Sequence, residues 1–237
     1  MTYQTGTSGI EQALVQRERW PGRYDAKYTP LVYPGQNVSS DQPVLRLEYA
    51  SSIEHTHGSH RPVPATEVVI AGLAGRVMKM TPRGGVVIEG RATVVRGGIG
   101  IGNQVAGVLT LWPPRGNTLS SLPSNALLVV PGPISFAFLH QAVTSGVSGV
   151  IASSIATCDL EGFLHTDIIQ LLDFDDVEMA QMHLPPITLF LTEGLGTSAM
   201  PPQALNLLSH YQDTTALLSG VTSTCRAIFP ELLIPLT

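Results

Sequence analysis

The sequence predicts a mixed α+β fold, in which a β-rich N-terminal region precedes a small, parallel, three-layer α/β region. Short apolar stretches, many of them β-branched and separated by Gly, Pro and polar residues, fill residues 28–112. Apolar runs alternate with helical patterns over residues 124–237. The charge divides in the same way: residues 1–115 hold 12 of the 13 Lys and Arg, whereas residues 116–237 hold 10 of the 18 Asp and Glu.

The β-rich region follows a peripheral segment, residues 1–27. In that segment we expect two helical turns from Ile10 to Glu18, ended by Trp20-Pro21-Gly22. The clearest hairpin turns at Thr81-Pro82-Arg83-Gly84, where proline and glycine suit a tight turn. The predicted strands lie at 30–33, 43–49, 67–70, 76–80, 85–88, 92–95 and 104–112. Residues 28–112 should therefore form one β-rich domain.

Residues 113–123 are the most linker-like stretch and separate the two predicted domains. Beyond them, a strand at 126–130, a helix at 134–144 and a strand at 149–152 form a βαβ unit, whose two strands should be parallel. The other predicted elements are helices at 159–172, 175–182 and 202–211 and strands at 187–191, 216–218 and 232–236. Residues 124–237 should therefore form an α/β domain.

The composition argues against several classes of protein. No apolar run approaches the roughly 18 residues that a membrane helix needs, and the polar N-terminus lacks the features of a signal peptide. We therefore expect a cytoplasmic protein in which Cys158 and Cys225 are buried free thiols. The basic residues are scattered rather than clustered, which disfavours nucleic acid as a partner. No cofactor is indicated.

A polar stretch over residues 51–62 contains three imidazoles within six residues. His55, His57 and His60 are candidate ligands for zinc, nickel or copper, with Glu54 beside them. The alternative is a solvated, histidine-rich loop, because ordering a loop around a metal costs conformational entropy.

Two further motifs have a functional and a structural interpretation. Gly97-Gly-Ile-Gly-Ile-Gly102 suggests a dinucleotide loop, but a strand pattern follows it where a helix is needed, which favours a bulge or tight bend in a sheet. Val77-Met-Lys-Met80 resembles the lysine motif of biotinyl carrier domains. Lys79, however, precedes the predicted turn and should lie within a strand.

The ends of the predicted parallel strands offer a candidate ligand site. In open parallel sheets, ligands bind at the carboxyl ends of the strands. Here those ends carry Gly132, the pair Ser153 and Ser154, and the loop Thr192-Glu193-Gly194. Backbone N–H groups, hydroxyls and one carboxylate would suit a small polar ligand, and Asp159 and Glu161 at the next helix start would lie near it. The alternative is a set of ordinary turns and helix caps.

The chain also resembles known families. Residues 33–47, Tyr-Pro-Gly-Gln-Asn-Val-Ser-Ser-Asp-Gln-Pro-Val-Leu-Arg-Leu, resemble a half-motif of lipoyl-like barrel-sandwich hybrids, with the second half-motif at Ala71–Val77. From Gly75 onward, phrases such as Gly98-Ile-Gly-Ile-Gly-Asn-Gln-Val-Ala-Gly107 and Phe229-Pro-Glu-Leu-Leu-Ile-Pro235 are similar to an uncharacterised family of bacterial proteins. The resemblance implies a barrel-sandwich-like domain followed by an α/β domain, and it brings no activity with it.

The sequence as a whole favours a non-enzymatic binding or assembly module. Low charge together with high apolar content predicts self-association, as a homo-oligomer or with another protein. The alternative is a small-molecule-binding protein or an enzyme that uses the strand ends.

Overall fold

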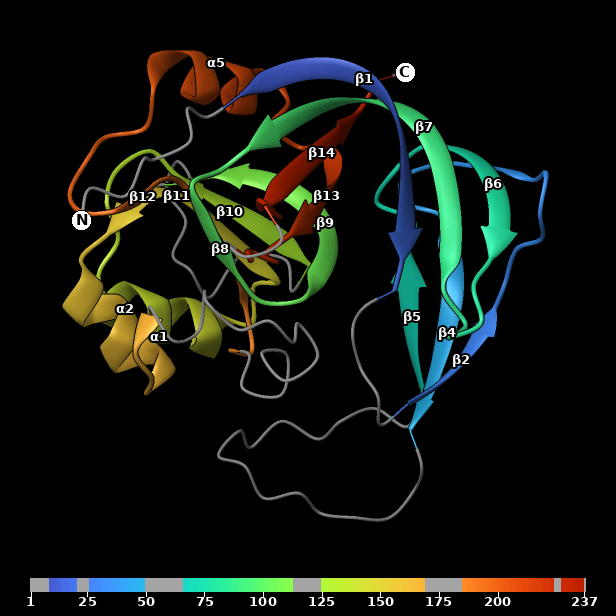
Figure 1. Cartoon of the computed structure of the whole chain (residues 1–237), viewed down its shortest axis with the longest axis horizontal. Coiled ribbons are helices and arrows are strands. Elements are labelled where there is room, and N and C mark those ends of the chain that lie inside the picture. Colours follow the sequence, from blue (N-terminus) through green and yellow to red (C-terminus); the bar gives the residue numbers. More distant parts are fainter. Residues whose placement is uncertain are drawn as a thin grey trace.

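One large sheet runs through the molecule and curls into a half-barrel at one end (Figure 1). The computed structural model describes residues 9–20, 26–49, 66–112, 125–168, 185–223 and 227–236. The large sheet has the order β3-β6-β7-β14-β13-β9-β10-β11-β12-β8, with β1 on the other side of β7, and a three-stranded sheet has the order β2-β4-β5. The predicted mixed α+β class is confirmed.

The described strands are β1 (Ile10–Arg19), β2 (Ala26–Pro30), β3 (Asn37–Val38), β4 (Pro43–Tyr49), β5 (Thr66–Ile70), β6 (Gly75–Met80), β7 (Val86–Arg96), β8 (Ile99–Ile101), β9 (Gln104–Leu111), β10 (Ala126–Val130), β11 (Gly149–Ile155), β12 (Thr188–Leu195), β13 (Thr215–Ser219) and β14 (Glu231–Pro235). The described helices are α1 (Phe136–Ser145), α2 (Thr157–Leu164) and α5 (Pro202–His210).

Four strands, β9 to β12, form the parallel part of the large sheet. The residues of β10 and β11 are all buried, as expected for parallel strands covered on both faces. The connection β10–α1–β11 confirms the predicted βαβ unit.

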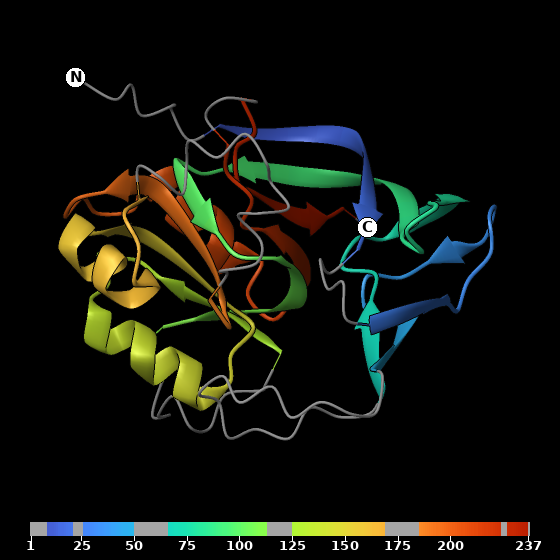
Figure 2. The same ribbon diagram turned by 60° about the horizontal axis from the view of Figure 1, so that its bottom comes forward.

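Helices cover both faces of this parallel part (Figure 2). Leu139 and Ala142 of α1 and Leu160 of α2 pack on one face, in the same apolar cluster as Leu128 and Val150 of the strands. Ala204 and Leu208 of α5 pack on the opposite face, in the cluster that contains Ile151 and Phe190. This arrangement is the three-layer α/β architecture that the sequence predicts.

The half-barrel end encloses a separate apolar core. Val15, Leu45, Leu73 and Val77 are buried there together with Ile88. The β6–β7 hairpin turns where predicted: the Thr81 N–H donates to the Gly85 carbonyl (2.9 Å), and Gly84 has a left-handed φ of 83°. Lys79 lies within β6, also as predicted.

The predicted helical turns from Ile10 to Glu18 are wrong. The segment is strand β1 and pairs antiparallel with β7 along its whole length, from Ile10 opposite Val95 to Arg19 opposite Val86. Its side chains alternate across the sheet, so that Val15 is buried and Leu14 is exposed. Pairing with β7 outweighs the local helical pattern, because helix propensity is a weak preference that tertiary contacts override.

A buried cation anchors the end of β1. The Arg19 guanidinium donates to the Ile70 carbonyl (2.8 Å) and to both the carbonyl and the side-chain oxygen of Gln104 (3.1 Å each). Burial lowers the pKa of Arg19 to about 10. Because Gln104 begins β9, this contact fixes β1 against the start of the parallel strands.

The large sheet joins the two regions that the sequence separates. Four strand pairs cross between them: β9 with β10, β9 with β13, β8 with β12, and β7 with β14. The Arg17–Glu231 ion pair also links the basic region to the acidic one, with a distance of 2.8 Å from Nη2 to Oε2. The linker at 113–123 lies outside the described residues, and the division into two domains stays a prediction.

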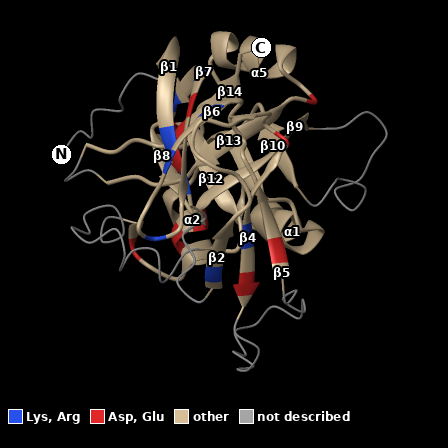
Figure 3. Cartoon of the chain, turned by 90° about the vertical axis from the view of Figure 1, so that its right-hand side faces the viewer, with Lys and Arg blue, Asp and Glu red and all other residues tan. Residues whose placement is uncertain are grey.

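The charged side chains of the described residues gather toward the half-barrel. Figure 3 shows them along β1 and on β2, β4 and β5, whereas α5 carries none. The described residues of the parallel part and its helices therefore include few charged residues, and these are carboxylates.

Candidate functional site

A cleft lies at the carboxyl ends of the four parallel strands. It has a volume of about 440 Å³. Its lining comes from the end of each strand and from the starts of α1 and α2: Trp112, Val130, Pro133, Ile134, Ser135, Phe138, Ala156, Asp159, Gly196 and Thr197. This is the edge at which open parallel sheets bind their ligands.

Backbone hydrogen bonds hold the strand ends in place around the cleft. The Trp112 N–H donates to the Val129 carbonyl at 2.8 Å, which ties the end of β9 to β10. The Ile134 N–H donates to Ser154 (2.9 Å), and the Gly196 N–H donates to Ile155 (2.8 Å). The cleft is therefore built on the sheet itself, so its walls are ordered before any ligand arrives.

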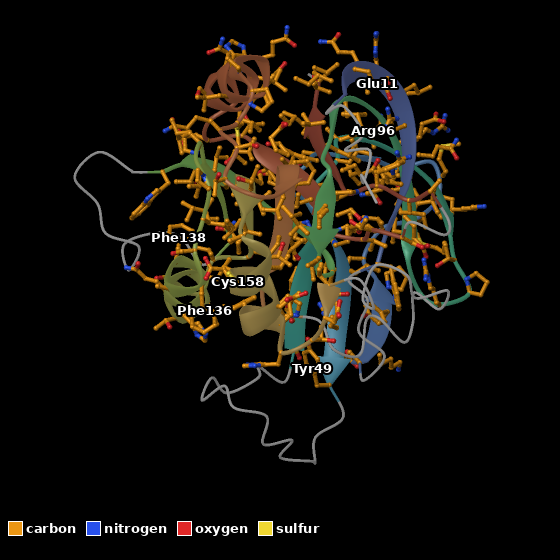
Figure 4. All side chains as sticks on the ribbon, turned by 60° about the vertical axis from the view of Figure 1, so that its left-hand side comes forward. Glu11, Tyr49, Arg96, Phe136, Phe138 and Cys158 are labelled. Atoms are coloured by element: carbon orange, nitrogen blue, oxygen red, sulfur yellow. The ribbon has the colours of Figure 1, made fainter. Side chains whose placement is uncertain are left out.

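One wall of the cleft is aromatic. The rings of Trp112 and Phe138 meet edge to face, with centroids 6.1 Å apart. Val130 and Ile134 are buried beside them. Figure 4 shows Phe138 with Phe136 and Cys158 on the side of the molecule that carries α1 and α2. Such a wall suits the apolar body of a small ligand.

The polar groups of the cleft come from Ser135, Asp159 and Thr197. Ser135 is the N-cap of α1, and its hydroxyl accepts the Phe138 N–H at 3.4 Å. Asp159 lies in the first turn of α2, where the positive end of the helix dipole favours a carboxylate. No described residue bonds to the hydroxyl hydrogen of Ser135 or to the side-chain oxygens of Asp159, so these groups can meet a ligand.

The predicted site residues come together, but they do not line this cleft. β11 and β12 run three to four residues further than predicted, so Ser153 and Ser154 lie within β11, and Thr192, Glu193 and Gly194 lie within β12. Gly132 lies beside them, since the Ser153 N–H donates to its carbonyl at 3.4 Å. A ligand-binding role for these six residues stays a prediction.

Ser153, Thr192 and Glu193 form a β-bulge in the pairing of β11 with β12. Ala152 pairs with Leu191 and Ser154 with Gly194, so Thr192 and Glu193 together oppose Ser153. Ser153 and Thr192 are buried, and their hydroxyls have no hydrogen-bond partner among the described residues. By strand alternation they lie on the face of Ile151 and Phe190, which α5 covers.

The other polar residues at the strand ends have structural roles. The Ser154 hydroxyl donates to the Ser198 carbonyl at 2.9 Å, and Glu161 accepts the Ile168 N–H at 3.4 Å. Glu193 is half-buried and forms no hydrogen bond or ion pair with the described residues.

The metal prediction lies outside the described residues, because His55, His57 and His60 fall in the undescribed segment 50–65. Within the described ranges, no three His, Cys, Asp or Glu side chains gather in a way that would hold a metal ion. Cys158 is a free thiol, but the prediction that it is buried is wrong, because it lies on the exposed side of the first turn of α2. Cys225 lies outside the described part.

The glycine run belongs to the sheet, as predicted. Ile99–Ile101 form β8, which pairs antiparallel with β12, and β9 rather than a helix follows. A Cβ at Gly97 would lie 2.8 Å from the Leu191 carbonyl oxygen, so only glycine allows this close approach.

Sequence reasoning missed Trp112, Phe138 and Thr197 as lining residues. Trp112 directly precedes the linker-like stretch, and the sequence therefore did not predict that it lies beside the end of β10. Trp112 lies at the cleft because β9, a strand of the β-rich region, pairs parallel with β10 of the α/β region.

Comparison of the chain with protein-family models, with curated proteins and with solved structures gives no match. Within the described part of the chain, no helix has both the length and the apolar character that crossing a membrane requires. The resemblance to a bacterial family with a barrel-sandwich-like domain stays a prediction, as does a cytoplasmic location.

Proposed function

We propose that this protein is a non-enzymatic binding module that holds a small molecule in the cleft at the carboxyl ends of β9 to β12. The observation that carries the proposal is the cleft itself, which combines an aromatic wall with one carboxylate at the usual ligand edge of a parallel sheet.

The lining residues indicate the chemistry of the ligand. Trp112 and Phe138 favour a planar, apolar body, and Asp159 favours a hydrogen-bond donor or a positive charge. Ser135 and Thr197 add hydroxyls that donate or accept. A small aromatic or aliphatic amine of suitable size matches this set.

The same lining favours binding over catalysis. Of the described residues that line the cleft, Asp159 is the one with an ionisable side chain. A hydroxyl nucleophile needs an adjacent base to activate it, and many acid–base mechanisms use a second titrating group beside the first. A single carboxylate beside aromatic rings can bind a ligand without a second ionisable group next to it.

Three probes with the same body and different polar ends test the proposal: phenethylamine, 2-phenylethanol and 3-phenylpropionate. Thermal unfolding should give the largest stabilisation with the amine and the smallest with the carboxylate. At ten times its dissociation constant a ligand adds about 1.4 kcal/mol, or about 3–5 °C for a chain of this size. Asp159→Asn should remove the preference for the amine.

Glu193→Gln is the matched control. The sequence predicted that the Glu193 carboxylate belongs to the site, but in the structure it does not line the cleft. This variant should leave the response to phenethylamine unchanged. If Glu193→Gln abolishes the response and Asp159→Asn does not, the ligand binds at the bulge and the cleft proposal is wrong.

A further inference from the structure

Strand β1 leaves one of its two edges open. It pairs with β7 over ten residues, and among the described residues no other strand pairs with it. Figure 1 shows it beside β7, arching over the top of the molecule. Leu14 is 66% exposed and Ile10 is 38% exposed. A long, unpaired edge of this kind is a template for another strand.

The alternating hydrogen-bond pattern of β1 identifies which backbone N–H and C=O groups lie on the open edge. The Arg96 N–H donates to the Gly9 carbonyl at 2.9 Å, so the odd-numbered residues of β1 bond to β7. The N–H and C=O groups of Ile10, Gln12, Leu14 and Gln16 therefore point away from β7. The Gln16 carbonyl also accepts from the Arg17 guanidinium (2.9 Å) and keeps a second lone pair for another strand. The Glu18 carbonyl confirms this pattern, because it accepts from the Gln104 side chain (3.0 Å) and not from β7.

This edge lacks the usual protection against strand pairing. Edge strands are commonly guarded by outward charges, by proline or by a bulge. Here Ile10, Gln12, Leu14 and Gln16 are uncharged, and β1 pairs with β7 without a register shift. The nearby charges are engaged within the chain, Glu11 with Arg96 (2.5 Å; Figure 4) and Arg17 with Glu231.

We propose that β1 pairs antiparallel with β1 of a second copy of this chain, with Leu14 opposite Leu14 on a two-fold axis. In this register Gln12 lies opposite Gln16, so all the paired residues are ones whose backbone groups face the open edge. Two hydrogen bonds at the Leu14 pair and two at each of the two Gln12–Gln16 pairs make six across the interface.

Charge selects this register over its neighbours. It places Glu11 opposite Arg17 of the other copy on both sides of the two-fold axis, which would join the two in-chain ion pairs into one alternating network. A shift by two residues in one direction puts Glu11 opposite Val15. A shift in the other direction puts Glu11 opposite Arg19, whose buried guanidinium is already bonded to Ile70 and Gln104.

A groove lies over the face of the sheet on the β7 side of β1. Leu14 and Gln12 border this groove of about 620 Å³, whose other lining residues include Gly90 and Leu236. A second copy placed on the open edge would cover Leu14, which borders this groove. The result is an isologous dimer in which the two large sheets become continuous.

Light scattering with size-exclusion chromatography, performed on the full chain over a range of concentrations, tests the proposal. The wild-type protein should have twice the 25.2 kDa mass of one chain. Leu14→Lys, which puts two ammonium groups on the two-fold axis, should shift the protein to monomer. Val68→Lys is the matched control, since Val68 is an exposed (51%) apolar residue on another strand, and it should remain a dimer.

Cross-linking tests the register. Leu14→Cys, in a background in which Cys158 and Cys225 are serine, should give a covalent dimer with a short bismaleimide, and Val68→Cys should not. Three results overturn the proposal: a wild-type monomer at every concentration, an oligomer that Leu14→Lys leaves intact, or an oligomer without cross-linking at position 14. Circular dichroism of each variant shows whether loss of the dimer reflects loss of the fold.

Discussion

At the scale of single residues, two glycines on β6 and β7 make the curl of the sheet possible. A Cβ at Gly75 would lie 1.9 Å from the Glu89 carbonyl oxygen, and one at Gly90 would lie 2.0 Å from the Ala74 carbonyl oxygen. Both obstacles are backbone atoms, which cannot rotate away as a side chain does. The two segments therefore approach closely only because neither has a side chain at the contact.

Gly90→Ala should destabilise the protein by about 2–4 kcal/mol, because the new methyl group forces the chain at Ala74 and Gly75 away from β7. Chemical denaturation measures this change. Gly132→Ala is the control, since a Cβ there has no atom within 4 Å, and its unfolding free energy should stay near that of the wild type. Equal stability of the two variants would contradict the close approach.

The buried hydroxyls at the bulge give a second test at this scale. Thr192→Val and Ser153→Ala remove hydroxyls that have no hydrogen-bond partner among the described residues. Replacing an unpartnered buried polar group by an apolar one is neutral or stabilising, here by up to about 1 kcal/mol. A loss of stability in these variants would show instead that the hydroxyls have a partner.

At the scale of elements, the turn of the β6–β7 hairpin is fixed to the end of β1. Glu18 accepts hydrogen bonds from Thr81 (2.6 Å) and from Arg83 (Nε, 2.9 Å), and the Arg83 guanidinium lies 4.2 Å from the centre of the Trp20 ring. The Arg83 hydrogen bond lowers the pKa of Glu18 below its ordinary value of 4.5, against the opposing effect of burial.

This shift predicts how stability depends on pH. Because the folded-state pKa lies below the unfolded value, ionised Glu18 stabilises the fold above about pH 4.5, and this contribution is lost as the pH falls through the lower, folded-state pKa. Glu18→Gln should cost about 1 kcal/mol at pH 7, given partial solvent screening, and progressively less in acid. Denaturation at several pH values measures it, with Arg83→Gln as the partner in a double-mutant cycle. A difference that does not vary with pH would contradict the ion pair.

The elements also show what sequence patterns can and cannot predict. Runs such as Ala126–Val130 are apolar throughout and flanked by turn residues, so their buried strands and the helix between them were predictable. The strand β1 was not, because its apolar residues also fit a helical spacing and only the partner strand β7 decides between the two. The ends of β11 and β12 were misplaced because Ser153 and Thr192, polar residues that normally mark a strand end, are buried inside the sheet.

At the scale of the whole molecule, the continuous sheet is the feature that no local pattern predicts. Pairs such as β7 with β14 join residues more than a hundred positions apart, and they depend on long-range packing. The candidate cleft depends on the same pairing, since Trp112 reaches it only because β9 lies beside β10. The sequence predicted that a candidate site would lie at the carboxyl edge of the parallel strands. It could not predict the lining residues, because they depend on the register in which the strands pair.

The shared sheet predicts a single cooperative unfolding transition for the whole chain. Strands β8 and β9 complete the sheet of the C-terminal region, and β14 completes that of the N-terminal region. Scanning calorimetry should therefore show one transition, and residues 124–237 expressed alone should not give a stable fold. Two separate transitions would support the two domains that the sequence suggests.

The most direct test of the cleft as a binding site uses the two tryptophans of the chain, Trp20 and Trp112. Each indole N–H gives one signal in a nitrogen–proton correlation spectrum, and only Trp112 lines the cleft. During titration with phenethylamine, the Trp112 signal should shift in a saturable way while the Trp20 signal stays in place. If the Trp20 signal shifts instead, or neither signal shifts at saturating probe, the cleft is not the binding site.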